Sequence, residues 1–159
     1  MKKESNPLVA IDAGKSGGFA WEIGGKVEAQ KMPATETEVV QLFSDLREMA
    51  LNLDEKIPEV VIEKVGGYVG TPQTGASMFN FGKGYGVLIG AAIAFEMPLS
   101  LVRPQEWQKG MGVGPKGERT TTEWKRYLKE TAQRLFPDIP VTLSTSDALL
   151  LLVHARRTS

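Results

Sequence analysis

The chain has 159 residues, 42% of them hydrophobic and 24% charged, with a net charge of zero, and we expect one domain over residues 1–159 with a buried core. It has no cysteine and one histidine, which excludes disulfides, thiolate metal sites and multi-histidine zinc sites and leaves oxygen ligands, suited to Mg²⁺ or Mn²⁺, for any metal. Residues 1–7 carry no apolar segment and no apolar run has membrane-spanning length, so we expect a flexible N-terminus, no signal peptide and no membrane partner.

The first half of the chain predicts three strands in an antiparallel meander, then a helix and a fourth strand. Glycines and small polar residues at 14–18 predict a tight turn between the first two strands. The helix is expected to begin at Thr35 or Thr37 and to end near Leu53, because apolar residues recur along it at helical spacing. The strands are expected at residues 8–13, 19–23, 26–31 and 59–63.

The second half predicts one more strand and several helices. A helix over residues 76–95 contains four glycines. Each is unfavourable by about 1 kcal/mol relative to alanine, and we expect them to allow close approach of another backbone, either a helix or a ligand strand. Residues 66–75 and 110–117 are expected to be loops, the second of them mobile. The other elements are expected as a strand at 98–102, a short helical piece at 104–108 and helices at 120–136 and 144–157.

These elements follow the order β-β-β-α-β-α-β-α-α, which is typical of an α/β fold. The runs at 8–13 and 59–63 are continuously apolar, as expected for central strands that are covered on both faces. We therefore predict a five-stranded mixed sheet with helices on both of its faces.

Basic residues gather in the last third of the chain. From Arg103 onward there are ten lysines and arginines against six acids, an excess that permits a basic face for an anionic polymer. The same region also fits a helix exposed to solvent, because Glu123, Arg126, Glu130 and Arg134 alternate in sign at helical spacing. The charge pattern alone leaves both interpretations open.

Three acids mark the ends of buried elements. Asp12 ends the apolar run at 8–11, Glu63 ends the run at 60–62, and Asp147 stands at the start of the last apolar helix. A carboxylate at the end of a buried strand is costly to desolvate unless a cation pairs with it. If the three meet they repel one another, and divalent metal ions are the usual remedy.

Each acid also has an ordinary structural interpretation. Asp12 can serve an Asx-turn at the entry to the hairpin, and Glu63 can form a salt bridge with a lysine at the end of the sheet. Asp147 follows Ser144 by three residues, which is the spacing of a capping box at a helix N-terminus. The occurrence of all three acids together favours a metal site.

The order of elements and the positions of the acids resemble the RNase H-like nucleases, and within them the RuvC-type Holliday junction resolvases. Residues 11–14 are similar to the first motif of that family, and residues 61–65 to the second, in which a glutamate ends the fourth strand. The basic, glycine-containing residues 109–119 and the Ser-Asp-Ala-Leu sequence at 146–149 resemble later motifs. The resemblance extends over about residues 8–157.

The resemblance implies hydrolysis of DNA phosphodiester bonds with two Mg²⁺ or Mn²⁺ ions about 3.5–4 Å apart, giving 5′-phosphate ends. Asp12 would bridge both ions, Glu63 would bind one and Asp147 the other, with Ser144 as a contact through water. The resemblance also implies a homodimer that nicks four-way junctions symmetrically, no organic cofactor, and a cytoplasmic protein encoded by a bacterium or a phage. The candidate DNA contacts are Lys15, Tyr68, Lys83, Lys109, Lys116 and Arg119.

Some positions depart from the family pattern or have a second interpretation. Ser144 stands where many members have an acid or a histidine, and Gly66 stands where some have an aromatic wedge, with Tyr68 nearby. The apolar side of the helix at 76–95 fits either the core or a two-fold dimer interface. The basic loop residues also fit a solvated loop. His154 is expected on a helix face, and Trp107 and Trp124 are expected to anchor the core or a loop.

Three other functions remain open. Residues 11–18 also resemble the first phosphate loop of sugar-kinase and actin-like proteins, although the chain is too short for the second domain that closes over their nucleotide. Ser144 in place of an acid permits a catalytically weak or silent module that binds branched DNA. A nuclease of the same fold acting on forks, flaps or RNA hybrids is the third, because the contacts that select a substrate lie in loops.

Overall fold

The computed structural model describes residues 5–65 and 74–159. Gly66 and Tyr68, at the expected wedge, lie outside the described residues. The strands are β1 (Leu8–Asp12), β2 (Gly18–Ile23), β3 (Lys26–Lys31), β4 (Glu59–Glu63) and β5 (Leu99–Val102). The helices are α1 (Glu36–Asn52), α2 (Gly75–Ala94), α3 (Pro104–Gly110), α4 (Thr121–Leu135) and α5 (Ser146–Thr158). None of these helices is long and apolar enough to cross a membrane, a finding that covers the two described ranges.

The strands form one sheet in the order β3-β2-β1-β4-β5. β1, β2 and β3 pair antiparallel, whereas β4 runs parallel to β1 and β5 runs parallel to β4. The sheet is therefore mixed, with β1 and β4 as inner strands, and the predicted fold class is confirmed. The helical piece expected at 104–108 continues to Gly110 as α3, so three helices follow β5 where the predicted order has two.

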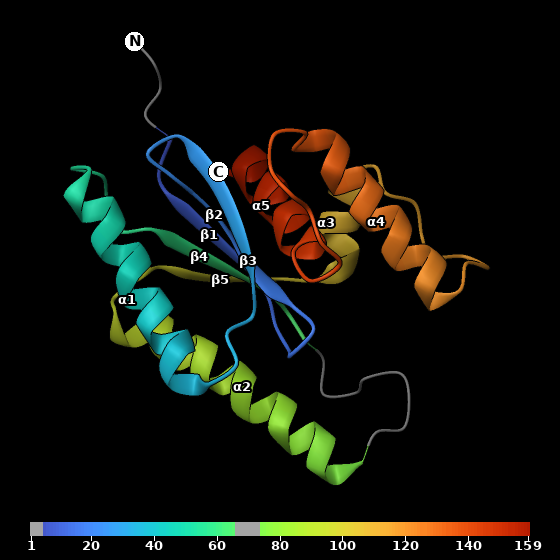
Figure 1. The fold of residues 1–159 in the computed structure, drawn as a ribbon, viewed down its shortest axis with the longest axis horizontal. Helices are drawn as coiled ribbons and strands as arrows, with labels where there is room; N and C mark the ends of the chain where they lie inside the picture. Colours follow the sequence, from blue (N-terminus) through green and yellow to red (C-terminus); the bar gives the residue numbers. More distant parts are fainter. Residues whose placement is uncertain (1–4, 66–73) are drawn as a thin grey trace.

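Helices cover both faces of the sheet because side chains alternate along each strand. Val9 and Ile11 of β1 pack in the core on the side of α1 and α2, whereas Leu8 and Ala10 pack in the core on the side of α5. Figure 1 shows α3, α4 and α5 gathered on one side of the sheet and α1 and α2 on the other. The side chain of residue 12, two positions after Ala10, therefore faces α5.

Helices α1 and α4 begin at capping boxes. The Thr35 hydroxyl accepts a hydrogen bond from the Glu38 N–H at 3.2 Å, and the Glu38 carboxylate accepts one from the Thr35 N–H at 3.1 Å. Thr120 and Glu123 make the same exchange at 3.1 and 3.4 Å. A cap of this kind stabilises a helix by about 1 kcal/mol, and it fixes Thr35 rather than Thr37 as the cap of α1.

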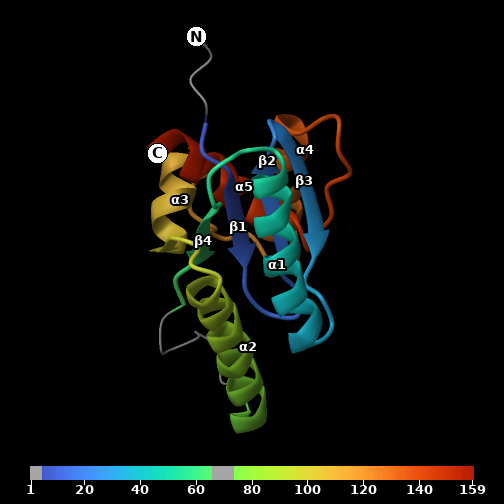
Figure 2. The same cartoon turned by 90° about the vertical axis from the view of Figure 1, so that its left-hand side faces the viewer.

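Helix α2 packs only part of its apolar side against the core. Leu88 is 2% exposed and belongs to the core, whereas Phe79 is 69% exposed and does not. The first turns of α2 extend beyond the sheet (Figures 1 and 2). A methyl group added at any of its four predicted close-approach glycines would meet no atom of the described chain within 4 Å, so no other backbone approaches them there. These glycines are Gly82, Gly84, Gly86 and Gly90.

Two segments expected to be flexible or mobile are tied to the fold where the structure describes them. Val113, in the loop after α3, is 5% exposed, and its N–H is hydrogen-bonded back to α3. Near the N-terminus, the Asn6 carbonyl accepts from Arg156 Nη1 at 2.9 Å, and the Pro7 carbonyl accepts from the Glu59 N–H at 3.0 Å. Burial and main-chain hydrogen bonds therefore anchor the chain at these positions.

Candidate active site

Asp12 and Glu63 lie at the carboxyl ends of two neighbouring parallel strands. The register of β1 and β4 sets Ile11 opposite Ile62, so the next residue of each strand falls at the same edge of the sheet. The side chains two residues earlier in each strand pack in the core on the side of α5. Because side chains alternate along a strand, both carboxylates face α5 as well.

Asp147 comes to the same edge from α5. The helix begins after Thr145, whose side chain makes no capping hydrogen bond, and Asp147 stands in its first turn. The segment before the helix lies against the start of β2, since a methyl group on Gly18 would come within 2.6 Å of the Ser144 carbonyl oxygen. Gly18 pairs with Asp12 in the sheet, so glycine at this point lets the segment that carries Ser144 approach Asp12.

The three carboxylates are largely buried and repel one another. Burial first, and then the charges of Asp147 and Glu63, raise the pKa of Asp12 to about 8. Burial raises the pKa of Asp147 to about 6. Burial also raises the pKa of Glu63, opposed by a hydrogen bond from Trp107 and assisted by the charge of Asp147. Without a bound cation, the folded protein therefore keeps a proton on Asp12 at neutral pH.

Among residues 5–65 and 74–159, the acids do not make the turn, salt-bridge and capping contacts that their ordinary structural interpretations require, although Asp147 does stand in the first turn of α5. The Asp12 carboxylate accepts no hydrogen bond from them, as an Asx-turn would require. Glu63 pairs with none of their lysines and accepts a hydrogen bond from Trp107 instead. The cap of α5 is Thr145 rather than Ser144, so the expected capping box with Asp147 does not form.

The donor set fits a divalent metal ion in its chemistry. Carboxylate oxygens are the ligands that Mg²⁺ and Mn²⁺ prefer, and a cation at this edge would offset the repulsion that raises the pKa of Asp12. In the described part of the chain, however, no three His, Asp or Glu side chains converge closely enough to hold one ion together. A metal ion at this edge would therefore take its ligands from two of these carboxylates and from water rather than from all three acids at once.

Two residues at this edge were not selected from the sequence. The Trp107 Nε1–H donates a hydrogen bond to Glu63 Oε2 at 2.7 Å, a contact for which the sequence carries no signal. The charge of Lys125 lowers the pKa of both Asp12 and Asp147, although Lys125 forms no ion pair with either acid. The sequence indicates Lys125 only as one of the ten basic residues from Arg103 onward. It does not single Lys125 out, because the same helix also fits a solvated surface.

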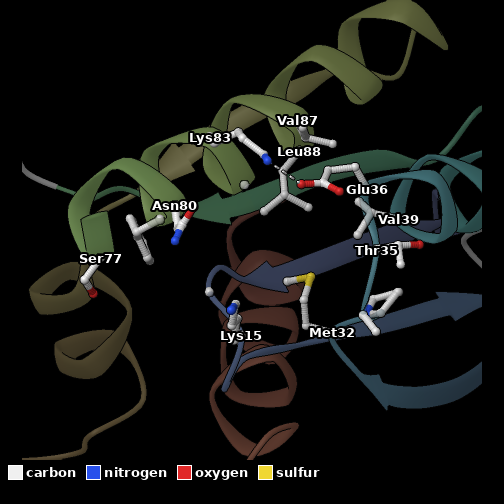
Figure 3. Close-up of a pocket in the computed structure, with 15 residues that line it drawn as sticks. Lys15, Met32, Thr35, Glu36, Val39, Ser77, Asn80, Lys83, Val87 and Leu88 are labelled. Atoms are coloured by element: carbon white, nitrogen blue, oxygen red, sulfur yellow. Dashed lines mark ion pairs between the residues drawn. The ribbon is translucent and has the colours of Figure 1, made fainter. Parts of the chain in front are cut away.

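Lys15 and Lys83 line one cavity between α1, α2 and the turn after β1 (Figure 3), with a volume of about 480 Å³. Lys83 Nζ lies 3.1 Å from Glu36 Oε1, whereas Lys15 is exposed and forms no ion pair within the described ranges. Gly14 has a φ of 101°, and a methyl group on it would lie 3.2 Å from the Phe81 ring. None of the three acids lines the cavity, although its wall includes Gly14 and Lys15, which follow Asp12 in the chain.

The remaining basic candidates lie on α3 and in the loop that leads to α4. Lys109 is exposed in the last turn of α3. Lys116 Nζ donates to a threonine hydroxyl at the start of α4 at 3.1 Å. The Arg119 guanidinium lies 4.4 Å from the centre of the Tyr127 ring and 5.8 Å from that of Trp124, which holds it against α4. The structure thus separates the basic candidates into a cavity group and an α3–α4 group.

The sheet order and the helices on both faces define an α/β architecture of the RNase H-like class. Thermus thermophilus RuvC has this fold, with a TM-score of 0.57 and 17% identity over 96% of this chain and 95% of that one. T. thermophilus RuvC in complex with a Holliday junction substrate has a TM-score of 0.58 and 16% identity over 96% of this chain and 94% of that one. No protein-family model matches the chain, and no curated protein matches it in sequence.

Proposed function

We propose that this protein is a divalent-metal-dependent endonuclease that cuts branched DNA, with four-way junctions as its main substrate. The observation that carries the proposal is the cluster of Asp12, Glu63 and Asp147, which are largely buried at one edge of the sheet and repel one another. The fold is similar to that of RuvC in complex with a Holliday junction substrate, which supports branched DNA as the substrate class.

In this proposal, Asp12, Glu63 and Asp147 would hold two Mg²⁺ or Mn²⁺ ions, with Asp12 shared between them and Ser144 as a contact through water. The ions supply activation of the attacking water and stabilisation of the leaving oxygen in hydrolysis of a backbone phosphate, which leaves a 5′-phosphate. The chain gathers the carboxylates at one edge of the sheet. Lys125, whose charge lowers the pKa of Asp12 and Asp147, would add positive charge where negative charge develops on the phosphate.

Basic residues on both sides of the acid cluster are proposed to contact DNA phosphates. The exposed Lys15 is expected to contribute more than Lys83, whose ammonium group is already 3.1 Å from a carboxylate of α1. Contacts of this kind release counterions, so binding should weaken steeply as salt rises. The proposed contacts are Lys15, Tyr68, Lys83, Lys109, Lys116 and Arg119, of which Tyr68 lies outside the described residues.

A two-fold homodimer is part of the proposal, because symmetric nicking of two strands needs two sites related by a dyad. Helix α2 offers an apolar surface for it, since Met78, Phe79 and Ile93 are 47%, 69% and 65% exposed. The open space beside the α2 glycines would let a helix of a second copy approach closely.

Cleavage of a labelled four-way junction in Mg²⁺ or Mn²⁺ tests the proposal, with duplex, fork and single-strand controls. We expect paired symmetric nicks, reduced at least about 1,000-fold by Asp12→Asn, because that change removes the central ligand. Asp54→Asn is the matched control. Asp54 lies between α1 and the start of β4 and has a φ of 56°, a conformation that asparagine tolerates, so we expect cleavage at the wild-type rate.

A catalytically silent module that binds branched DNA is the second candidate function. The observation that favours it is Ser144. Its hydroxyl is a weaker metal ligand than the acid or histidine that would help Asp147 to bind the second ion. Tight binding of branched DNA without cleavage in either metal would select this function. Cleavage of forks or flaps in preference to junctions would keep the chemistry and replace the substrate.

A further inference from the structure

Trp107 is the largest side chain in the fully buried core, and its one polar atom points at an acid of the proposed site. The side chain is 0% exposed. Its Nε1–H donates to Glu63 Oε2 at 2.7 Å, which is short for a hydrogen bond between nitrogen and oxygen. A buried indole N–H needs an acceptor, but main-chain carbonyls are far commoner acceptors than carboxylates.

The topology delivers Trp107 to this place. In the parallel pair of β4 and β5, Val102 lies opposite Glu63, so β5 ends beside the acid. Pro104 begins α3 two residues later, and its fixed φ suits the first position of a helix. The helix carries Trp107 over the end of β4 and into the core that also contains the apolar face of α5.

The same short helix is fixed against α5, the helix that carries Asp147. Gly110, at the end of α3, lies so close to His154 of α5 that an added methyl group would come within 2.7 Å of His154 Nδ1. His154 lies on α5 and is 7% exposed, so the helix face that carries it packs against α3. Trp107 therefore connects Glu63 in the sheet to the helix of Asp147 through one rigid element.

We propose that Trp107 is a positioning residue that fixes the Glu63 carboxylate in the orientation in which it binds a divalent cation. This inference rests on the proposed function. An indole N–H donates one hydrogen bond and accepts none, so it holds Oε2 and leaves Oε1 available to the ion. Because indole is neutral, it orients the carboxylate without neutralising the charge that attracts the cation, whereas a lysine or arginine in its place would compete with the ion.

Partners of this kind, behind a metal ligand, typically change metal affinity or activity by about 10–100-fold when they are removed. Trp107→Phe keeps an aromatic ring in the core and removes the donor. We expect it to weaken Mn²⁺ binding, measured by electron paramagnetic resonance of free Mn²⁺ and by calorimetry, by about 10–100-fold. Junction cleavage should recover toward the wild-type rate at saturating Mn²⁺, a recovery that a general loss of structure would not give.

The matched control is Trp21→Phe. Trp21 is 7% exposed, and its Nε1–H also donates to a glutamate, Glu28 Oε2, at 3.2 Å, but on the side of the sheet that packs against α1 and α2. Trp21→Phe therefore removes the same type of hydrogen bond as Trp107→Phe, from a side chain that is also buried. We expect its Mn²⁺ affinity and its cleavage rate to equal those of the wild type, whatever its thermal stability.

A second variant guards against a folding defect in Trp107→Phe. Replacement of Trp107 by β-(3-benzothienyl)alanine, in which sulfur replaces the N–H, keeps the shape and removes only the donor, and should show the same loss of affinity. If this variant binds Mn²⁺ as tightly as the wild type, the positioning role is overturned while the proposed function stands. If the wild-type protein binds no Mn²⁺, or binds it no more tightly than Asp12→Asn does, the metal site of the proposed function is wrong. The role of Trp107 then fails with it.

Discussion

Helix α5 faces acids of the sheet at both of its ends. At one end it presents a positively charged side chain to the acid, and at the other it presents a further acid. Near its C-terminus, Arg156 Nε lies 2.9 Å from Glu22 Oε2, with both side chains about three-quarters covered, at 26% and 23% exposed. At its N-terminus, the same helix presents Asp147 to Asp12 and Glu63, where like charges meet.

The difference shows which end of the helix is structural. An acid with an arginine beside it has its charge balanced within the chain, and it needs nothing further to remain folded. Three largely buried carboxylates meet at the N-terminal end, and among the described residues the exposed Lys125 is the one positive charge that lowers the pKa of Asp12 and Asp147. Their unbalanced negative charge favours a cation from solution. Clusters of strongly raised pKa values are typical of functional sites. The Arg156–Glu22 pair shows that the same helix can place a basic residue beside an acid of the sheet.

The largest expected consequence is a fall in stability as pH rises in the absence of metal. The pKa of Asp12 is raised to about 8 and that of Asp147 to about 6, so the folded state holds protons that the unfolded chain releases near pH 4. Their contribution is fully present below about pH 4 and is lost as pH rises through 6 and then 8. Urea unfolding in EDTA should show a free energy lower at pH 8 than at pH 5 by on the order of 1–4 kcal/mol.

Two changes should remove that pH dependence. Asp12→Asn takes away the acid with the most strongly raised pKa, so it should raise the unfolding free energy at pH 8 and flatten the profile between pH 6 and 8. Mg²⁺ should stabilise the wild type more at pH 8 than at pH 5, because it binds the deprotonated carboxylates. If, in EDTA, the unfolding free energy of the wild type depends on pH as little as that of Asp12→Asn, the charge at this edge is not unbalanced.

Near the C-terminus of α5, Arg156 balances the charge of Glu22. Arg156→Met leaves Glu22 without its partner and removes the hydrogen bond to the Asn6 carbonyl, so we expect a loss of about 1–3 kcal/mol in unfolding free energy. Mn²⁺ affinity should stay at the wild-type value. Urea unfolding and calorimetry measure the two quantities, and the double variant with Glu22→Gln should recover part of the stability. A loss of metal affinity in Arg156→Met would show that the two ends of α5 are coupled.

The smallest expected effect is that of Lys125→Met. Removing this charge raises the pKa of Asp12 and Asp147 further, because Lys125 lowers both in the wild type. We expect the rising limb of the pH profile of junction cleavage to move to higher pH, and the rate at pH 7 to fall about tenfold. Arg126→Met, one residue along the same exposed helix surface, is the control and should leave the profile in place. Equal profiles for the two variants would remove Lys125 from the site.

Much of the fold could be predicted from local pattern. Continuous apolar runs predicted β1 and β4 as inner strands, and apolar residues at helical spacing after a threonine predicted α1. The exposed side of α2 could not be predicted in this way, because Phe79 and Leu88 are equally apolar in sequence and differ only in whether the sheet reaches them. The same limit applies to Val113, whose loop composition indicated mobility while its burial anchors the chain.

For the candidate site, the sequence alone determined the chemistry of the donors. Three acids at the ends of apolar elements, in a chain without cysteine, restrict any metal site to oxygen ligands, and residue type is a local property. Only the tertiary structure decided what surrounds these acids. The register of β4 and β5 brings Trp107 to Glu63 across 44 residues of chain, and the charge of Lys125, on α4, lowers the pKa of Asp12. Contacts between residues so far apart in sequence depend on strand pairing and helix packing, which no short pattern encodes.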